Sequence, residues 1–547
     1  MIIAGHGLTS DLNLLARAGF DVHVPGVRYF DTHVASRWVW PDQPDHSLEA
    51  LALRATSMGQ WRPTLGKLKI HDFEAMSEPD LKQRCGGDAE APVHLARILA
   101  QEIRRYDLIR VWNLAMSVLP ILAEMGGRGM CIDLRALQRR ADDTRFYSYG
   151  QWLKRERQRL EAILGIQNLG SSLQLSNAIF TGLQATPLRR TQQSYSTDHT
   201  SLLWARRNAE AQGNMFLKDL LDRVLVWKIK EKIYTTYYVG WLRNPATQDG
   251  HVHSFYSLGT TATGRMASSN ENLQNIPKEV RSLIIPSDGY DHILQSDFKM
   301  LEICVAAHVS QDPVMLDWVR RGLDIHSLMA ARVAGLKEPR TPDEFLRFKA
   351  EHPTERATGK MANFAMLYGI EADSLRWKIF GDTEGKIYLD ERDMQRYIDT
   401  FFQTFTGYQS HVADLKAATA RQQWMISPFG RRWIFPSNPA GHRKSQNYVV
   451  QATASDLTIL ALVILYWELR RRGLKTRPIG EVHDSIIFET TTKELPEVSH
   501  LIKTVCENLP TAPYGFSLSV PLTVEISVGP NGAELTTEES EHPLRMS

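Results

Sequence analysis

An apolar segment with a charged interruption places the tightest constraint on this chain. The stretch "GEVHDSIIFET", residues 480–490, has the β-branched and aromatic composition of a buried strand, yet His483 and Asp484 stand in its middle. Moving an unpaired carboxylate out of water is costly, so a buried Asp has a partner or binds a metal ion. Two interpretations stay open for this stretch alone: a turn at the tip of a hairpin, where Asp serves turn chemistry, or a metal ligand.

A second carboxylate stands at the end of another apolar segment. Residues 292–298, "HILQSDF", are typical of a strand, and the next ten residues are typical of a helix, so Asp297 falls at their junction. A strand end holds a catalytic side chain rigidly. Asp297 and Asp484 are therefore a candidate pair, and two neighbouring carboxylates would repel each other unless a cation lay between them. Mg²⁺ takes such oxygen ligands, and pairs of such ions serve phosphoryl transfer.

Two segments repeat side chains every four residues, which places them on one face of a helix. In 355–370 the repeat is Arg356, Lys360, Phe364 and Tyr368; the cations suit a triphosphate, and a ring one turn further suits a base or sugar. In 442–457 the repeat is Arg443, Asn447 and Gln451. Amides can hydrogen-bond to acceptors in the minor groove, although a capped, partly exposed helix face is the favoured interpretation for these three residues alone.

Length and charge limit the class of protein. A chain of 547 residues is expected to form several domains, and a net charge of +2 excludes a general polycation. Basic residues interleaved with tyrosines at 216–242 suit a nucleic-acid backbone, although a solvated helix face is the alternative for each lysine. The four cysteines form no CxxC pair, and the apolar run at 457–469 is too short to span a bilayer. We therefore expect a soluble protein of a reducing compartment, without a zinc site or a membrane segment.

Four motifs in one order resemble the DNA polymerase I family, also called family A. They are "TTATGRMASSNENLQNIP" (260–277), "DFKMLEICVAAH" (297–308), "RATGKMANFAMLYG" (356–369) and "VHDSIIFE" (482–489), and the resemblance covers about residues 120–535. It implies a mixed α/β (α+β) fold, a right-hand polymerase with palm, fingers and thumb that follows a partial ribonuclease H-like exonuclease domain. The expected divisions are 1–105 for the incomplete 3′–5′ exonuclease, 106–250 for the thumb and connecting helices, 251–325 for the first part of the palm, 326–425 for the fingers and 426–547 for the second part of the palm.

The resemblance also implies an activity and a set of roles. The activity is template-directed addition of dNTPs to a primer 3′ end by two Mg²⁺ ions, with Mn²⁺ as a substitute, in bacterial or phage DNA replication in the cytoplasm. Asp297 and Asp484 would bind the metal ions, and Glu302 would block a ribose 2′-OH. Substrate-binding roles fall to Arg356, Lys360 (also catalytic), His326, Phe364, Tyr368 and Gly369. Contacts to primer–template DNA fall to Arg265, Asn272, Gln274, Arg443, Asn447, Gln451 and His483.

Some positions depart from the family pattern. Ser485 stands where the family commonly has Glu, Met300 where it has Gln, and Cys304 where it has Arg, which resembles a phage-type enzyme more than a bacterial repair enzyme. The alternatives are a non-catalytic DNA-binding scaffold and a single-subunit RNA polymerase. The four intact residues Asp297, Asp484, Arg356 and Lys360 argue against the scaffold, and Glu302 and Phe364 favour deoxynucleotides. Replication partners such as a helicase or a clamp stay open.

The first hundred residues resemble a 3′–5′ exonuclease domain more weakly. "AGHGLTSDLNLLARAGF" and "RCGGDAEAPVHLARIL" are similar to its second and third motifs, which places Asp11 and Asp88 at metal-binding positions. Arg84 stands where the family has Tyr, and we expect the Asp-x-Glu of the first motif to be missing. The resemblance therefore predicts a degenerate site and no proofreading by this chain alone, either through decay or because another polypeptide supplies the missing half.

Overall fold

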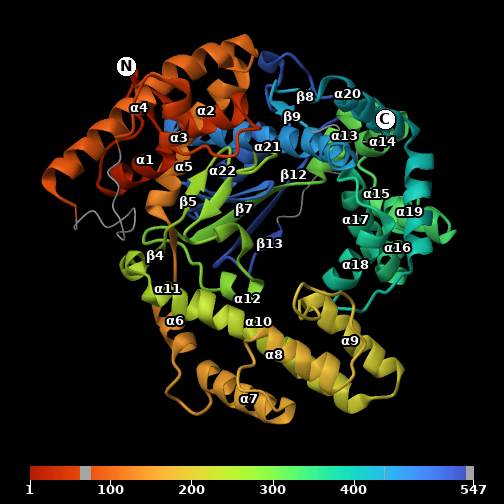
Figure 1. Cartoon of the computed structure of the whole chain (residues 1–547). Helices are drawn as coiled ribbons and strands as arrows, with labels where there is room; N and C mark the ends of the chain where they lie inside the picture. The colour runs from red at the N-terminus through yellow and green to blue at the C-terminus, as the bar shows by residue number, and fades with distance from the viewer. Residues whose placement is uncertain (62–75, 436–437, 538–547) are drawn as a thin grey trace.

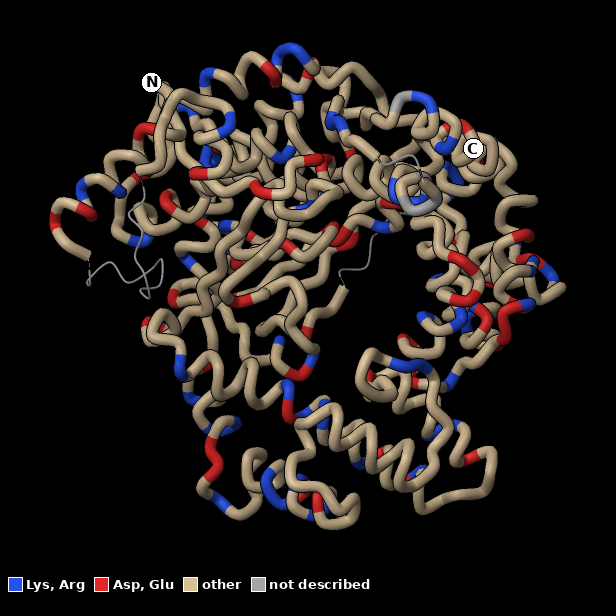
Figure 2. The backbone as a smooth tube through the Cα atoms, viewed as in Figure 1, with Lys and Arg blue, Asp and Glu red and all other residues tan. Residues whose placement is uncertain are grey.

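The computed structural model describes residues 1–61, 76–435 and 438–537, and Figure 1 shows how their elements are arranged. A sheet in the centre is covered by long helices. The helices of residues 301–422 gather on one side of it, and those of residues 134–243 lie below it in the view. Lys and Arg, like Asp and Glu, are spread over the whole molecule in Figure 2, in keeping with a net charge of only +2. The expected mixed α/β fold class is confirmed.

The central sheet has the strand order β10-β11-β7-β12-β13, and all its pairs are antiparallel. β7 occupies the middle and pairs along its whole length with β11 on one side and β12 on the other. Its buried side chains alternate with more open ones, as expected for a strand with one face on a core. The strands are β7 (His292–Phe298), β10 (Arg477–Val482), β11 (Ser485–Thr490), β12 (Val524–Gly529) and β13 (Thr536–Thr537).

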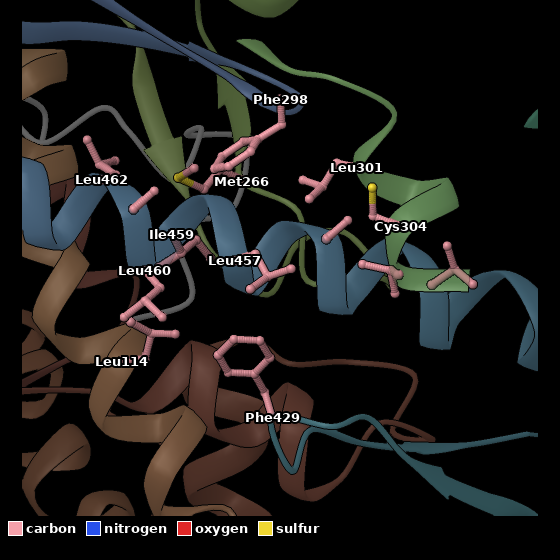
Figure 3. Close-up of a cluster of buried hydrophobic side chains, with 14 of the residues drawn as sticks. Leu114, Met266, Phe298, Leu301, Cys304, Phe429, Leu457, Ile459, Leu460 and Leu462 are labelled. Carbon is pink, nitrogen blue, oxygen red and sulfur yellow. The ribbon is translucent and has the colours of Figure 1, made fainter. Parts of the chain in front are cut away.

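One helix, α21 (Pro439–Arg471), runs beneath this sheet and packs against α5 (Ile109–Arg128) and α22 (Leu495–Glu507). Figure 3 shows its side chains Leu457, Leu460 and Leu462 among those of Leu114 and Phe298. Its stretch 443–471 is long and apolar enough to cross a membrane by composition, but 83% of the apolar window is buried inside the fold. The apolar run at 457–469 is therefore explained as the core helix of the sheet.

Buried charge fixes α21 to its neighbours. Asp456, fully buried in the helix, forms an ion pair of 2.5 Å with Arg431, which is only 3% exposed. The Arg431 guanidinium lies 4.1 Å from the ring centre of Trp38, on the N-terminal helix α2 (Thr32–Val39). Three segments that are far apart in the sequence thus meet at one buried cation.

The helices on the side of the sheet enclose an aromatic core that includes Tyr397, Phe401, Phe405 and Tyr408. They are α13 (Leu301–Ser310), α14 (Pro313–Arg320), α15 (Ile325–Ala334), α16 (Pro342–Glu351), α17 (Pro353–Leu367), α18 (Ala372–Asp382), α19 (Glu391–Thr404) and α20 (Thr406–Gln422), followed by the hairpin β8 (Trp424–Ile426) and β9 (Arg432–Ile434).

The lower helices have a separate core, and the segment 184–198, which is neither helix nor strand, leads into α9 at His199. The predicted helical stretch 216–242 is one continuous run in which a π-helical turn joins α10 to α11. These helices are α6 (Leu134–Ala141), α7 (Tyr149–Leu164), α8 (Ser172–Ser176), α9 (His199–Ala211), α10 (Met215–Ile233) and α11 (Gly240–Arg243), and short elements lead back to the sheet: β3 (Met130–Cys131), β4 (His251–Val252), β5 (Phe255–Ser257), β6 (Ala267–Ser269) and α12 (Lys278–Arg281).

The N-terminal unit is built on two parallel strands, β1 (Ile2–Gly5) and β2 (Arg28–Asp31), joined through α1 (Leu8–Arg17). The helices α2 (Thr32–Val39), α3 (Leu48–Ala55) and α4 (Glu78–Arg105) follow. Their buried side chains belong to the same core cluster as those of α21 and β7, so this unit packs directly on the rest of the molecule. The five domain divisions given above stay predictions.

We expect Asp312→Ala to lower the free energy of unfolding by about 3 kcal/mol, because its buried carboxylate accepts hydrogen bonds from three backbone N–H groups. One is that of Met315 in the first turn of α14, at 2.8 Å, and the others are those of Gly407 (2.7 Å) and Tyr408 (3.1 Å) at the start of α20. Denaturant unfolding followed by tryptophan fluorescence measures the loss.

The matched control is Asp317→Ala on the same helix, whose exposed carboxylate pairs only with Arg321 and should cost about 0.5 kcal/mol. Equal losses in the two variants would contradict the structural role of Asp312.

Candidate active site

The strand register brings the two candidate carboxylates to one end of the sheet. Asp297 on β7 lies opposite Ser485 on β11, and Asp484 immediately precedes Ser485. His483 and Asp484 form the two-residue turn between β10 and β11, because Val482 pairs with Ser485 and His483 has a φ of +63°. The predicted hairpin turn is thus confirmed, and it presents the Asp484 side chain beside Asp297, while metal binding by Asp484 stays a prediction.

The two carboxylates hold their protons more tightly than isolated ones. Partial removal from water, and then the negative charges of Asp484 and Glu525, raise the pKa of Asp297 to about 6. Burial likewise raises the pKa of Asp484, against the nearby charges of Arg265, His483 and Lys360. Ionised together they would repel each other, so this end of the sheet suits a cation.

The residues present fit Mg²⁺ better than a metal with a full protein cage. Within residues 1–61, 76–435 and 438–537, no group of three or more His, Cys, Asp or Glu side chains converges as a metal site. Mg²⁺ is commonly held by one or two carboxylates, together with water and substrate phosphates. The pair Asp297 and Asp484 matches that requirement.

Ser485, which stands in place of the family's Glu, is used inside the hairpin. Its hydroxyl is buried, donates to the Val482 carbonyl at 3.1 Å and accepts from Gln295 at 3.1 Å. A third carboxylate that the sequence analysis missed comes from the other neighbour strand: Glu525 on β12 lies opposite Asp297. An isolated Glu in the apolar segment 520–526 was the available signal, but only the register shows that it faces this site.

A buried triad links three of the four sequence motifs. Glu302, in the first turn of α13, is 5% exposed; it pairs with Arg265 and accepts a hydrogen bond from the Tyr368 hydroxyl at the end of α17. Burial raises the pKa of Glu302, while Tyr368 and Arg265 oppose that shift. The predicted site residues Arg265, Glu302 and Tyr368 are therefore brought together.

The helix α17 presents its predicted face beside the carboxylates. Lys360 is exposed, and its charge acts on both Asp297 and Asp484. Arg356 lies one turn earlier and forms an ion pair of 2.8 Å with Asp324, which caps α15. Phe364 follows one turn later, with its ring 5.5 Å from that of His326.

His326 is held as a neutral, oriented ring. Burial lowers its pKa to about 4, so it is uncharged near neutral pH. The side-chain amide of Asn363 donates to it across 3.1 Å, and Asn363 in turn accepts from the Tyr397 hydroxyl at 2.9 Å. Gly359 permits this close packing of α17 on α15, since a Cβ there would lie 2.6 Å from the His326 carbonyl oxygen.

The predicted DNA-binding residues of α21 stand at the end of that helix nearest α17. Arg443 is exposed and pairs with Glu371 at 2.8 Å, Gln451 contacts Tyr368, and the Asn447 Oδ1 atom is buried without a hydrogen-bond partner. Gly369 has a φ of +69° and lies against Gln446. The three repeat residues do share one side of the helix, as predicted.

Of two other predicted DNA contacts, Gln274 lies inside the fold and Asn272 is exposed. Gln274 is 9% exposed and donates to Glu481 at 2.7 Å and to the Met266 carbonyl at 3.0 Å. Asn272 caps the following short helix by accepting from the Gln274 backbone at 3.1 Å. Burial raises the pKa of Glu481 to about 8. Contacts of Asn272, Gln274 and His483 with DNA stay predictions.

Of the two predicted degenerate nuclease residues, Asp88 is engaged in contacts with other side chains, and Asp11 is exposed. Asp88 on α4 accepts from the Trp61 indole at 2.9 Å and lies 3.7 Å from the Arg84 guanidinium. Burial and the charge of Asp31 raise the pKa of Asp11. Asp31, which the sequence analysis missed, is fully buried and caps both α1 and α2 through four backbone N–H groups. The absence of proofreading stays a prediction.

Comparison with known proteins gives a consistent set of relatives. The model of DNA polymerase family A matches residues 146–534. DNA polymerase I of Pseudomonas aeruginosa is 27% identical over 96% of this chain and 55% of its own length, and that of Treponema pallidum is 26% identical over 96% of this chain and 50% of its own length. The chain thus spans about half the length of these curated relatives.

Among solved structures, the chain resembles the POL domain of Pol1 from M. smegmatis in complex with DNA primer-template and dNTP. The TM-score is 0.78 at 24% identity, and the likeness covers 96% of this chain and 85% of the other. At this level of identity the likeness establishes the shared fold.

The raised pKa of Asp297 predicts a pH-dependent stability when divalent metal ions are removed. Because the folded-state pKa of about 6 exceeds the ordinary value of 3.8, the stabilising contribution is fully present below about pH 4 and is lost as pH rises through about 6. Asn cannot ionise, so the melting temperature of Asp297→Asn should gain on the parent chain between about pH 4 and pH 6, where the folded and unfolded parent bind different numbers of protons. Thermal melts in EDTA measure the difference.

The exposed Asp288 on the same half of the molecule supplies a matched control. The Asp288→Asn variant should keep a constant offset from the parent across this range. A constant offset for Asp297→Asn as well would contradict the raised pKa.

Proposed function

The chain belongs to DNA polymerase family A, and from that membership we propose that it is a template-directed DNA polymerase that adds dNTPs to a primer 3′ end. The observation that carries the proposal is the strand register, which sets Asp297 and Asp484 side by side, facing the charged side of α17.

We propose distinct tasks for the two sides of the site. Asp297 and Asp484 would hold two Mg²⁺ ions, which supply charge stabilisation for the attacking and leaving oxygens. Lys360 is exposed, and its charge interacts with both carboxylates. A triphosphate placed between the carboxylates and α17 would therefore lie within reach of its ammonium group. Phosphoryl transfer depends on positioning and electrostatics, which is what these fixed side chains provide.

Arg356 and His326 would complete the triphosphate site. The ion pair with Asp324 fixes the direction of the Arg356 side chain, and a neutral His326 can donate one hydrogen bond without adding charge. Phe364 packs beside His326 and would support the sugar and base of the incoming nucleotide. Tyr368 and Gly369 would position the templating base.

Sugar selection is proposed for Glu302. Arg265 and Tyr368 hold its carboxylate in one place, so it would present a fixed obstacle to a ribose 2′-OH. Arg265, Asn272, Gln274, Arg443, Asn447, Gln451 and His483 would contact the primer–template. We propose cytoplasmic DNA replication or repair as the setting.

Primer extension tests the metal assignment. We expect Asp297→Asn and Asp484→Asn to lower the extension rate on the order of 1,000-fold or more, because each removes a charged ligand from a site that acts by electrostatic stabilisation. DNA affinity, measured by fluorescence anisotropy, should survive. Asp288→Asn serves as the control with normal extension, and near-normal extension by either site variant would overturn the assignment.

Competition between dNTPs and rNTPs tests the role of Glu302. In Glu302→Gln and Glu302→Ala, the ratio of kcat/KM for rNTP to that for dNTP should rise by roughly 10- to 100-fold, because the 2′-OH no longer meets a fixed carboxylate. The ratio is the readout, since loss of the Arg265 partner lowers both rates. An unchanged ratio with both rates reduced would leave Glu302 a purely structural residue.

A further inference from the structure

A second basic site lies behind the loop that carries Arg265. A cavity of about 230 Å³ opens where α2, the loop 259–264, the strand β9 and the start of α21 meet. The N-terminal unit contributes Arg37, Trp38 and His46 to its lining, and the remainder of the fold contributes Arg431, Arg432 and Lys444. The cavity therefore belongs to the junction between the two parts of the molecule.

The charges in this junction pocket are unbalanced. Its lining includes three Arg and one Lys, and neither an Asp nor a Glu lines it. Arg431 is compensated by the buried Asp456. In the described part of the chain, Arg37, Arg432 and Lys444 form no ion pair with a carboxylate, so the lining carries an excess of positive charge.

Two aromatic rings outside the pocket hold the Arg432 cation, and other rings form the pocket walls. The Arg432 guanidinium lies 4.2 Å from the ring centre of Tyr106 and 5.4 Å from that of Trp424. Trp433 and Tyr448 stand on the lining with their ring centres 6.2 Å apart. Alternating cations and rings suit a nucleotide chain, in which phosphates alternate with flat bases.

The pocket is built rather than accidental, because its loop is fixed at several points. The Trp433 indole donates to the Ala262 carbonyl at 2.9 Å, and Thr261 donates to the Arg265 carbonyl at 2.7 Å. Gly264 has a φ of +79°, and a Cβ there would lie 2.8 Å from the Arg431 guanidinium carbon. The next residue, Arg265, pairs with Glu302, so one short loop borders both the pocket and the proposed active site.

We propose that this junction pocket binds the sugar–phosphate backbone of single-stranded DNA, with a base stacked on its aromatic wall. The proposal rests on the proposed polymerase function and extends it to a segment outside the paired primer–template. Two sources have this chemistry: the unpaired 5′ extension of the template and a frayed primer 3′ end. A site of this size accepts one strand and excludes a duplex, and it assigns a DNA-binding task to α2 that is independent of any nuclease activity.

Fluorescence anisotropy with the full chain tests the proposal in the absence of dNTPs and divalent ions. Three labelled DNAs are compared: a blunt duplex, a duplex with a 5′ template extension, and a duplex with a mismatched primer 3′ end. In the Arg37→Ala/Lys444→Ala variant, affinity for one of the two DNAs with an unpaired strand should fall roughly tenfold, because two phosphate contacts are lost. The DNA that loses affinity identifies the source of the strand.

Salt dependence gives a second readout that a loss of folding would not produce. The slope of log K against log salt should become shallower by about 0.7 for each single-strand phosphate contact removed. The charge-preserving variant Arg37→Lys should bind these DNAs with most of the parent's affinity. Arg54→Ala, an exposed arginine on α3 of the same unit, is the matched control and should bind all three DNAs as the parent does.

Equal loss of affinity on the blunt duplex, or no loss on any DNA, would overturn the proposal. Because binding is measured without turnover, the result is independent of the polymerase assay. A chain that binds unpaired DNA through this pocket but fails to extend primers would refute the proposed function alone.

Discussion

The antiparallel pairing of β7 with β11 on one side and β12 on the other determines where each charged group of the proposed site stands. Side chains alternate between the two faces of a strand, so a slip of one residue would move Asp297 from the open face to the core. The same register aligns Asp297 with Ser485 and Glu525 and brings Asp484 to the adjoining turn. Apolar packing of β7 and β11 on α21 prevents that slip, because Leu294 and Phe488 would otherwise leave the core.

Arg431 shows how the rest of the molecule supports this arrangement. Both members of a buried ion pair lose their hydration. Removing one of them leaves an uncompensated buried charge, which lowers the free energy of unfolding by about 3–5 kcal/mol. Here the pair joins the hairpin β8–β9 to α21, and the ring of Trp38 covers it from the N-terminal unit. The N-terminal unit therefore contributes to the environment of α21, and this contribution does not depend on any nuclease activity of its own carboxylates.

The sequence predicted those parts of the site that depend on local pattern. The hairpin tip at His483 and Asp484, the strand ending near Asp297 and the helical face of Arg356 and Lys360 all follow from spacing along the chain. Glu525 and the interior bond between Gln274 and Glu481 did not, because they depend on which strands and loops become neighbours. Asp31 was missed for the same reason: its carboxylate caps two helices at once, and the spacing of residues along the chain does not show this.

The length of α21 has a mechanical consequence. Its 33 residues span about 50 Å, from Arg443 near α17 to Tyr466 and Arg470, which meet Glu124 and His23 in the N-terminal half. A hydrogen-bonded helix that packs along the core resists bending and twisting, so it behaves as a rigid rod that is attached at both ends. A displacement of α21 where it meets α17 would therefore reach its other attachment, at His23. The N-terminal half fixes that second end of the helix in place.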